Sequence, residues 1–323
     1  MRLPIIALIF LCSTSLCLAV EKVPAPIPLE PTTFATIPFG KGEGKIPTFK
    51  LGEVGEGVPT SFRFAPNGRL YLLVPHNHSL LVLDSTGKYE RTIKLRTKEG
   101  KALPKKAFLT DLAFDRKGNH LVLDRSGGWI SRFDKKGKAL GVFGQNVGAE
   151  RIFVTEDGNT IVRDSALGVL NFFDEAGAFI GEVRGPYLAP ETNSEGTLVR
   201  SRIIGDKRAF IWLRKAGTTL PRLFSIITPY YKKGKIYQAE TMGFDKKGTL
   251  YVLTTETEAD GKYVSYIYCL TPEAKVKARY RIEANMERLA ELPRFYRLSK
   301  DGRVITFRLT PKDYQVLVYD LDS

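Results

Sequence analysis

Three histidines are the first candidates for metal chemistry in this sequence: His76, His78 and His120. Imidazole suits zinc, and a catalytic zinc site needs about three protein ligands. His76 and His78 share one short loop, whereas His120 opens a predicted strand beside a turn. We therefore expect turn residues here and predict no metal site and no cofactor. His76 and His78 stay candidate binding residues, because the pair could form an adventitious metal site.

Other catalytic signatures are absent from the sequence. It has no Cys-x-x-Cys pair, no Gly-x-Ser-x-Gly nucleophile elbow and no glycine-rich phosphate loop. Asp124 and Asp164 could pass for an acid and base pair, but they repeat at equivalent positions, so we expect them to accept backbone hydrogen bonds in turns. We predict no catalytic residues, and the sequence favours a protein that is not an enzyme.

Two arginines occupy equivalent positions of a repeat that is described below. Arg63 lies five residues before Gly68, and Arg297 lies five residues before Gly302. Two guanidinium groups side by side could bind one carboxylate or phosphate through paired hydrogen bonds. The alternative is that each arginine pairs with an acidic residue of the protein. Both interpretations stay open, and Arg63 and Arg297 are candidate binding residues.

Positive charge is concentrated between Lys88 and Lys106. The stretch holds Glu90 and Glu99 against eight basic residues: Lys88, Arg91, Lys94, Arg96, Lys98, Lys101, Lys105 and Lys106. Over all 323 residues, 49 lysines and arginines exceed 35 acidic residues, giving a net charge of +14. Such a charge favours acidic partners. We expect an exposed basic ridge here, with Lys94 and Arg96 as candidate binding residues.

The partner of this ridge depends on where the protein works. The ridge is either a solvated face or a surface for an acidic protein or an anionic polymer of the cell envelope. Nucleic acid would suit the charge, but predicted export argues against it. Export is expected because Arg2 precedes a short apolar run, Ile5–Leu11, and a cleavage site after Ala19. No later segment reaches transmembrane length, so we predict a secreted or periplasmic protein with residues 1–19 as its signal peptide.

The rest of the chain divides into a linker and a repeat region. Residues 20–45 are rich in proline and are interpreted as an extended linker. From residue 46 to 323 the chain repeats. Three close copies each place a turn glycine sixteen residues before an aspartate: Gly68 and Asp84, Gly118 and Asp134, Gly158 and Asp174. Looser copies centre on Asp206-Lys207, Gly248 and Gly302, and such spacings suggest propeller blades.

Each repeat unit reads as four strands. Phe62 and Phe64 alternate before the first turn glycine, and equivalent pairs precede the other turns. Strands are predicted over Leu70–Val74, His120–Asp124 and Leu80–Asp84, and Gly87, Gly137 and Gly177 turn the chain into a fourth strand. Six units of four antiparallel strands predict an all-β fold, a six-bladed β-propeller. The last unit lacks its outer strand, and we predict that Ile46–Leu51 supplies it and closes the ring.

The repeat resembles a known family. Gly118–Asp124 (GNHLVLD) and Trp129–Asp134 (WISRFD) are similar to an NHL-repeat blade, which typically reads GNxYVAD…RIQVFDxxGK. Asn77 and His78 fall at the Asn-His pair of that family, whereas Val74 departs from its mid-blade aspartate. The resemblance is clear in three units and extends to the wider TolB-like superfamily of six-bladed propellers. It implies the fold, which serves enzymes, receptors and scaffolds alike.

Two functions follow as expectations. The first is an exported binding or scaffold module for a protein or an anionic envelope ligand. The alternative is a metal-dependent propeller hydrolase or lyase, like the lactonases and peptide-amidating lyases that share this architecture. Lactonases hold calcium with carboxylates and amides, and the inner-strand row contains neither: Arg63, Ala113, Phe153, Gly243 and Arg297. The row therefore favours the binding module.

Overall fold

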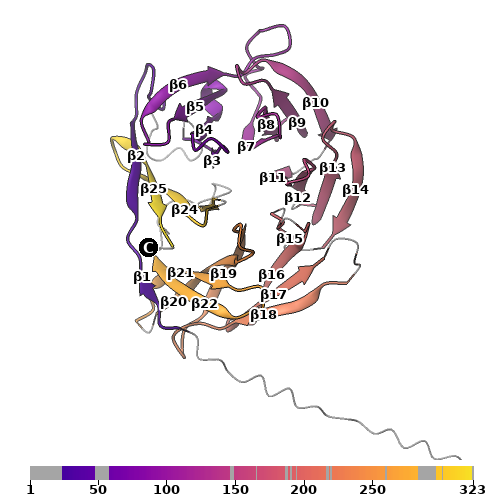
Figure 1. Cartoon of the computed structure of the whole chain (residues 1–323). Helices are drawn as coiled ribbons and strands as arrows, with labels where there is room; N and C mark the ends of the chain where they lie inside the picture. The colour runs from indigo at the N-terminus through magenta and orange to yellow at the C-terminus, as the bar shows by residue number, and fades with distance from the viewer. Residues whose placement is uncertain are drawn as a thin grey trace, which may run out of the picture.

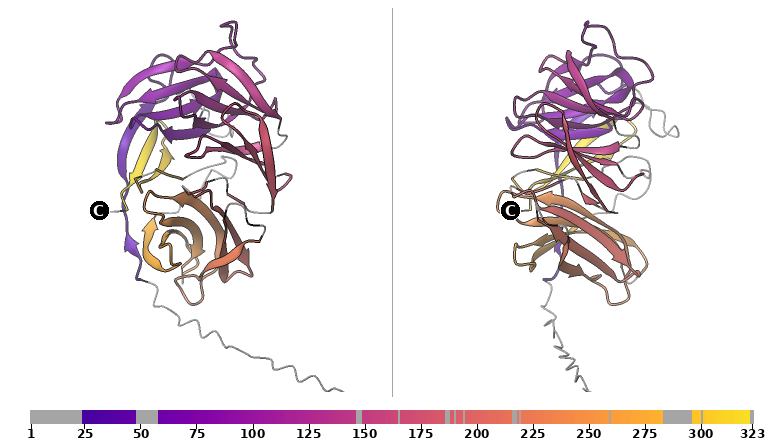
Figure 2. Two further views of the ribbon diagram at one scale, coloured as in Figure 1. Left: turned by 45° about the vertical axis from the view of Figure 1, so that its right-hand side comes forward. Right: turned by 90° about the vertical axis from the view of Figure 1, so that its right-hand side faces the viewer.

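The computed structural model describes residues 24–47, 58–145, 149–164, 166–185, 188–189, 191–193, 195–215, 218, 220–258, 260–282, 296–299 and 301–321. In this part of the chain, strands form six sheets that stand as blades around a central axis (Figure 1). Seen edge-on, the ring is a flat disc (Figure 2). The prediction of an all-β, six-bladed propeller is confirmed.

The first three blades follow the chain in order, from the axis outward. Blade 1 consists of β3 (Ser61–Phe64), β4 (Leu70–Val74), β5 (Ser79–Leu83) and β6 (Tyr89–Lys94). Blade 2 consists of β7 (Leu109–Phe114), β8 (His120–Asp124), β9 (Trp129–Phe133) and β10 (Ala139–Gln145). Blade 3 consists of β11 (Ala149–Val154), β12 (Thr160–Asp164), β13 (Val169–Phe173) and β14 (Phe179–Arg184).

The last three blades complete the circle. Blade 4 consists of β15 (Leu188–Ala189), β16 (Leu198–Ile204), β17 (Arg208–Arg214) and β18 (Arg222–Ile227). Blade 5 consists of β19 (Ile236–Phe244), β20 (Leu250–Thr257), β21 (Tyr263–Leu270), β22 (Val276–Ile282) and β1 (Ile27–Pro28). Blade 6 consists of β23 (Arg297–Leu298), β24 (Val304–Leu309), β25 (Asp313–Tyr319) and β2 (Thr32–Pro38). Within the described residues the one helix is the 3-10 turn Pro75–Asn77.

An N-terminal strand closes the ring, but it is not the predicted one. β2 pairs antiparallel with β25 and is the outer strand of blade 6. Of the predicted segment Ile46–Leu51, Ile46 makes an isolated bridge to Phe39 and residues 48–51 lie outside the described residues. β2 fits the role because Ala35 and Ile37 alternate into the core, while its one proline, Pro38, stands at the strand end where no ladder donor is needed.

The N-terminal segment also reaches blade 5. β1 pairs parallel with β22, and the Leu29 amide donates a hydrogen bond to the Arg281 carbonyl at 3.0 Å. Residues 27–38, which the sequence analysis places in the linker, therefore add strands to two neighbouring blades. The segment ties blade 5 to blade 6 at the outer edge of the ring (Figure 1).

The core of the molecule lies between blades. In the described residues, buried apolar side chains form six clusters, and each joins the facing surfaces of two adjacent blades. The cluster between blades 6 and 1 shows the pattern: Phe62 packs edge-on against Phe307, with ring centroids 6.1 Å apart. The two-residue apolar period of each strand produces these faces, because alternate side chains point to opposite sides of a sheet.

The last turn of each of the first three blades touches the preceding blade. Gly87, Gly137 and Gly177 have φ angles of +86°, +88° and +98°. A Cβ atom on Gly87 would lie 1.9 Å from the Phe34 carbonyl oxygen of β2, and one on Gly137 would lie 2.3 Å from the Lys94 carbonyl oxygen of β6. These turns therefore need glycine twice over, for their backbone conformation and for the close approach.

Aspartates hold these turns in shape. Asp84 Oδ1 accepts hydrogen bonds from the Thr86 and Lys88 amides at 2.8 and 3.0 Å, and Asp134 Oδ1 accepts equivalent bonds from Lys136 and Lys138. Asp124, which was predicted to be a turn residue, accepts backbone hydrogen bonds in the same way. Short polar side chains that bond to nearby amides stabilise such turns locally. The repeated aspartates are thus explained by the turns.

In the described residues, no helix has the length and apolar character that a bilayer span requires.

The close approach at Gly87 gives a first prediction. Gly87→Ala should lower the free energy of unfolding by about 2 kcal/mol more than Gly68→Ala, measured by urea denaturation. The two glycines have similar φ angles, +86° and +79°, so the backbone strain is matched. Only at Gly87 would the new methyl group meet backbone, because the nearest atom to a Cβ on Gly68 is 3.6 Å away. Equal losses for the two variants would show that β2 does not press on this turn.

Candidate functional site

The three histidines lie in turns and in the core. His78 has a left-handed backbone at the end of the 3-10 turn, and its Nε2 lies 3.2 Å from the Ala107 carbonyl oxygen. His76, two residues earlier, is exposed. His120 is buried between blades 1 and 2, where its Nδ1 lies 3.0 Å from the Asp134 carbonyl oxygen. In the described residues no group of three His, Cys, Asp or Glu side chains could hold a metal ion.

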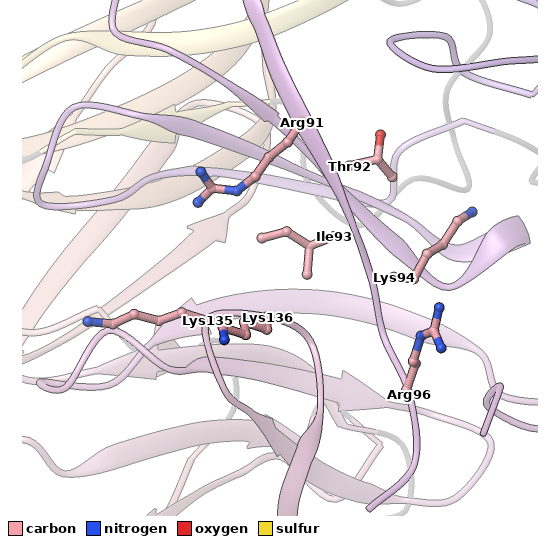
Figure 3. Close-up of a pocket in the computed structure, with 7 residues that line it drawn as sticks. All are labelled: Arg91, Thr92, Ile93, Lys94, Arg96, Lys135 and Lys136. Atoms are coloured by element: carbon pink, nitrogen blue, oxygen red, sulfur yellow. The ribbon is translucent and has the colours of Figure 1, made fainter. Parts of the chain in front are cut away.

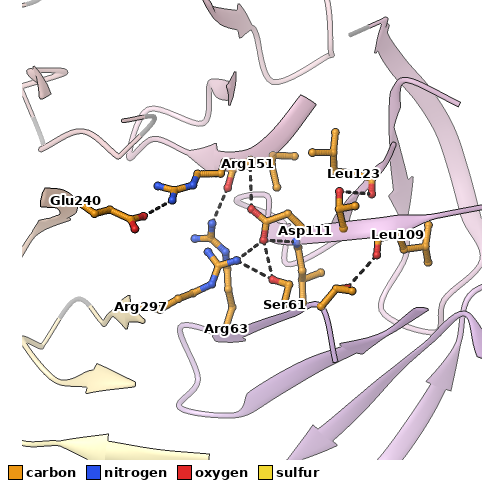
Figure 4. Close-up of polar contacts among 12 residues, drawn as sticks. Ser61, Arg63, Leu109, Asp111, Leu123, Arg151, Glu240 and Arg297 are labelled. Carbon is orange, nitrogen blue, oxygen red and sulfur yellow. Dashed lines mark hydrogen bonds and ion pairs between the residues drawn. The ribbon is translucent and has the colours of Figure 1, made fainter. Parts of the chain in front are cut away.

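Arg297 lies close to the central axis and is bound by the protein itself. It forms an ion pair with Asp111 of β7, and its NH2 group donates a hydrogen bond to Ser61 Oγ of β3 at 2.7 Å (Figure 4). Ser61 Oγ in turn donates to Asp111 Oδ1 at 2.7 Å. All three side chains are buried. Blades 6, 1 and 2 are therefore joined by one charged cluster at their inner strands.

Arg63 extends this cluster to blade 3. Its NH2 group donates a hydrogen bond to the Ile152 carbonyl oxygen at 2.6 Å, and the Ile152 amide donates to Asp111 Oδ2 at 3.0 Å. Arg151 forms an ion pair with Glu240 of blade 5 across the axis (Figure 4). Five blades thus contribute to the charged belt, which we define as Ser61, Arg63, Asp111, Arg151, Glu240 and Arg297.

Of the two interpretations of Arg63 and Arg297, the contacts of Arg297 match pairing with an acid of the protein. A ligand role for the two arginines stays a prediction. The acid Asp111 does not belong to the row of inner-strand residues that lie five before each turn glycine, so that row did not predict it. Residues seven before the glycine lie on the same face of the strand, since side chains alternate. That second row contains Ser61, Asp111 and Arg151 and, with Arg63 and Arg297 of the first row, includes the members of the belt other than Glu240.

A second group of cations lines a groove on the outside of the ring. The groove has a volume of about 610 Å³ and lies between blades 1 and 2 (Figure 3). Its lining residues are Arg91, Thr92, Ile93, Lys94, Arg96, Lys135 and Lys136, which we call the basic groove. The residues up to Lys94 belong to β6, Arg96 follows that strand, and the two lysines form the turn between β9 and β10. Two of the candidate binding residues, Lys94 and Arg96, therefore lie in one groove.

Backbone contacts between the two blades shape the basic groove. The Arg96 amide donates to the Gly137 carbonyl oxygen at 2.8 Å, and the Ala139 amide donates to the Arg96 carbonyl oxygen at 3.0 Å. Ile93 is buried beneath the turn, while the cationic side chains on either side of it are exposed. Because strand and turn are bonded to each other, the groove has a backbone frame that does not depend on the long side chains.

The groove is strongly electropositive. Its lining contains five cationic side chains and no acidic one. Arg91 also pairs with Glu90, which lies next to it on β6 outside the lining. Like charges gathered in this way raise the local concentration of anions. The remaining lysines of the predicted ridge, such as Lys98 and Lys105, are exposed but do not line the groove.

Lys135 and Lys136 were missed as site residues. They occupy the turn positions of a repeat unit, where charged residues are usually solvated and carry no functional signal. Their place in the groove comes from blade packing, since the glycine turn after them rests on β6. The signal in the sequence is the turn glycine itself, because the turns at Gly87, Gly137 and Gly177 each contact the outer strand of the unit before it.

The buried ion pair of Arg297 gives a second prediction. Arg297→Met should lower the free energy of unfolding by about 3 kcal/mol or more, because it leaves the buried Asp111 carboxylate without its cation. Arg303→Met is the control, since Arg303 pairs with the half-exposed Asp301 in the same blade and should cost less than about 1 kcal/mol. Chemical denaturation of both variants measures the difference. Similar small losses would mean that Arg297 does not hold the inner strands together.

The burial of His120 gives a pH prediction. Burial lowers the pKa of His120 from 6.5 to about 4, so the folded protein keeps the ring neutral where the unfolded chain binds a proton. Its contribution to stability is present above pH 6.5 and is lost as the pH falls toward 4. The loss between pH 7 and pH 5 should be about 2 kcal/mol. His120→Gln cannot take up that proton and should lack this part of the pH dependence. Parallel stability curves for the two proteins would contradict the prediction.

Comparisons with solved structures agree with the fold. Virginiamycin B lyase from Staphylococcus aureus aligns with a TM-score of 0.50 at 10% identity, covering 83% of this chain and 97% of that one. A streptogramin B lyase gives 0.50 at 12% identity, covering 83% and 95%. A member of the DUF4221 family from Bacteroides vulgatus gives 0.50 at 11% identity, covering 90% and 98%. No family model and no curated protein matches the chain. At these identities the likeness shows the propeller fold alone.

Proposed function

We propose that this chain is an exported, NHL-like propeller that works as a binding module and takes a multivalent anionic ligand of the cell envelope in the basic groove. The observation that supports the proposal is the lining itself: five cationic side chains and no carboxylate. Cationic side chains that are held close together repel one another, which lowers the stability of the folded protein. An anion that binds between them removes this repulsion, so its binding is favourable.

The arrangement of the cations favours a ligand with several charges. Arg91 and Lys135 extend toward one end of the groove, whereas Lys94 and Arg96 lie at the other (Figure 3). One small anion cannot contact both ends. An extended polymer, or an array of anionic groups on a surface, can neutralise the cations one after another, and the attraction of the separate contacts adds.

The frame of the groove supports specific binding over a general attraction to a basic protein. The groove is built on strand β6 and on a turn whose aspartate, Asp134, bonds two of its own amides. Sites on such rigid elements lose less freedom on binding than sites on loops. The smaller basic cluster at Lys232 and Lys233 lies in an exposed turn and does not line the groove.

This contrast supplies the test. Fluorescence anisotropy with labelled inorganic polyphosphate measures affinity for the wild-type chain, a Lys94→Glu/Arg96→Glu variant and a Lys232→Glu/Lys233→Glu variant. The two variants change the net charge equally. The groove variant should lose affinity by roughly tenfold or more and show a flatter dependence of affinity on salt, because fewer counterions are released. The control variant should stay within about threefold of the wild type.

Two results would contradict the proposal. Equal losses in both variants would show that the attraction follows the net charge of the molecule and not the groove. Undiminished binding by the groove variant would place the anion elsewhere. Circular dichroism of each variant verifies that the strands remain folded.

A further inference from the structure

Beside the basic groove lies a set of exposed apolar side chains. Leu140 and Val142 on β10 are 49% and 63% exposed, and Phe179 and Ile180 on β14 are 58% and 54% exposed. We call these four residues the apolar rim. They belong to the outer strands of blades 2 and 3, which form the outside of the ring (Figure 1). Single exposed apolar residues are common, whereas several of them on neighbouring strands are a candidate surface of interaction.

The two strands that carry the apolar rim are neighbours. Phe143 of β10 packs on the turn before β14, since a Cβ atom on Gly177 would lie 2.6 Å from its ring. The Phe143 and Phe173 rings are 5.7 Å apart, and the Phe173 and Phe179 rings are 5.8 Å apart. The middle of β10 therefore lies against the start of β14, so the two strands that carry the exposed side chains are neighbours on the outside of the ring.

The apolar rim also adjoins the basic groove. Lys135 and Lys136 stand in the turn that leads directly into β10, so Leu140 follows them by a few residues. The outer strands follow one another around the ring in the order β6, β10 and β14 (Figure 1). The outer strands of blades 1, 2 and 3, with the cations of the basic groove and the side chains of the apolar rim, are together called the outer strip.

β10 is poorly suited to pairing with a strand from another protein. Charge is not the reason, because β10 carries no charged residue, unlike β6, β14 and β22. The reason is its irregular backbone. Its ladder with β9 shifts register at two places, between Ala139 and Gly141 and between Phe143 and Gln145. Gly144 has a φ angle of +61°. Bulges of this kind interrupt an edge and prevent an incoming strand from pairing in register. The side chains of β10, and not its backbone, are what the surface offers.

We propose that the outer strip binds an anionic lipid surface, with the basic groove taking the phosphate headgroups and the apolar rim entering the interface between headgroups and acyl chains. The inference rests on the proposed function and specifies its ligand. A bilayer presents an array of negative charges above an apolar layer, which matches cations and exposed aliphatic and aromatic side chains on neighbouring outer strands. A soluble polyanion would satisfy the groove but would leave Val142 and Ile180 in water.

Vesicle sedimentation tests the inference. The wild-type chain should sediment with vesicles of phosphatidylcholine mixed with phosphatidylglycerol and remain in solution with phosphatidylcholine alone. Val142→Gln/Ile180→Gln should weaken binding to the mixed vesicles by roughly tenfold, because it removes apolar contacts with the interface. The matched control is Leu220→Gln/Leu223→Gln, which changes two exposed leucines near β18 and should bind within about twofold of the wild type.

Polyphosphate binding separates this inference from the groove proposal. The Val142→Gln/Ile180→Gln variant should bind polyphosphate as the wild type does, which also shows that it is folded. A wild-type chain that binds polyphosphate but no mixed vesicles overturns the lipid inference and leaves the groove proposal standing. So does a rim variant that binds vesicles undiminished, or a wild-type chain that prefers poly-glutamate, an acidic protein partner, to vesicles. A chain that binds neither polyphosphate nor vesicles overturns both.

Discussion

The outer strands of blades 6, 1 and 2 press on the last turns of blades 1, 2 and 3, and much of the structure depends on these contacts. At Gly87, Gly137 and Gly177 there is no room for a side chain, so the backbone of one blade rests directly on its neighbour. The contact sets the distance between blades at the outside of the ring, as the apolar clusters do deeper in. It also brings the lysine turn of blade 2 against β6. Without that contact the cations of blades 1 and 2 would be separate surface charges.

Local sequence patterns predicted the strands within a blade, but they did not predict which segment pairs with a strand far away in the chain. Leu70–Val74 and His120–Asp124 were predicted residue for residue, because alternation and a turn glycine mark a strand within a few positions. The closing strand was placed at Ile46–Leu51 instead of Thr32–Pro38. Its partner, β25, lies at the other end of the chain, so no neighbouring residue indicates the register. The flanking prolines also disguised a proline-free run between residues 32 and 37.

The candidate sites show the same division. Arg63 and Arg297 were found as equivalent positions, which needs only the repeat, but Asp111 comes from blade 2 and its meeting with Arg297 needs the closed ring. Lys94 and Arg96 were found as part of a basic run. Lys135 and Lys136 join them through the packing of one blade on another. Residues marked by the repeat or by a run of charge were predicted, whereas Asp111, Lys135 and Lys136, which join a site through the packing of neighbouring blades, were missed.

The closing strand has a consequence for how the protein is made. β2 is synthesised before blades 1 to 4, yet its partner β25 comes after them, and Thr32 bonds to Val318 across 286 positions. Joining such distant segments carries an entropic cost of about 5 kcal/mol. A chain that emerges from its amino end must keep β2 unpaired until the final strand arrives. Blades 1 to 3, whose contacts are local, can assemble during that wait, so ring closure is expected to follow the assembly of the blades between its two strands.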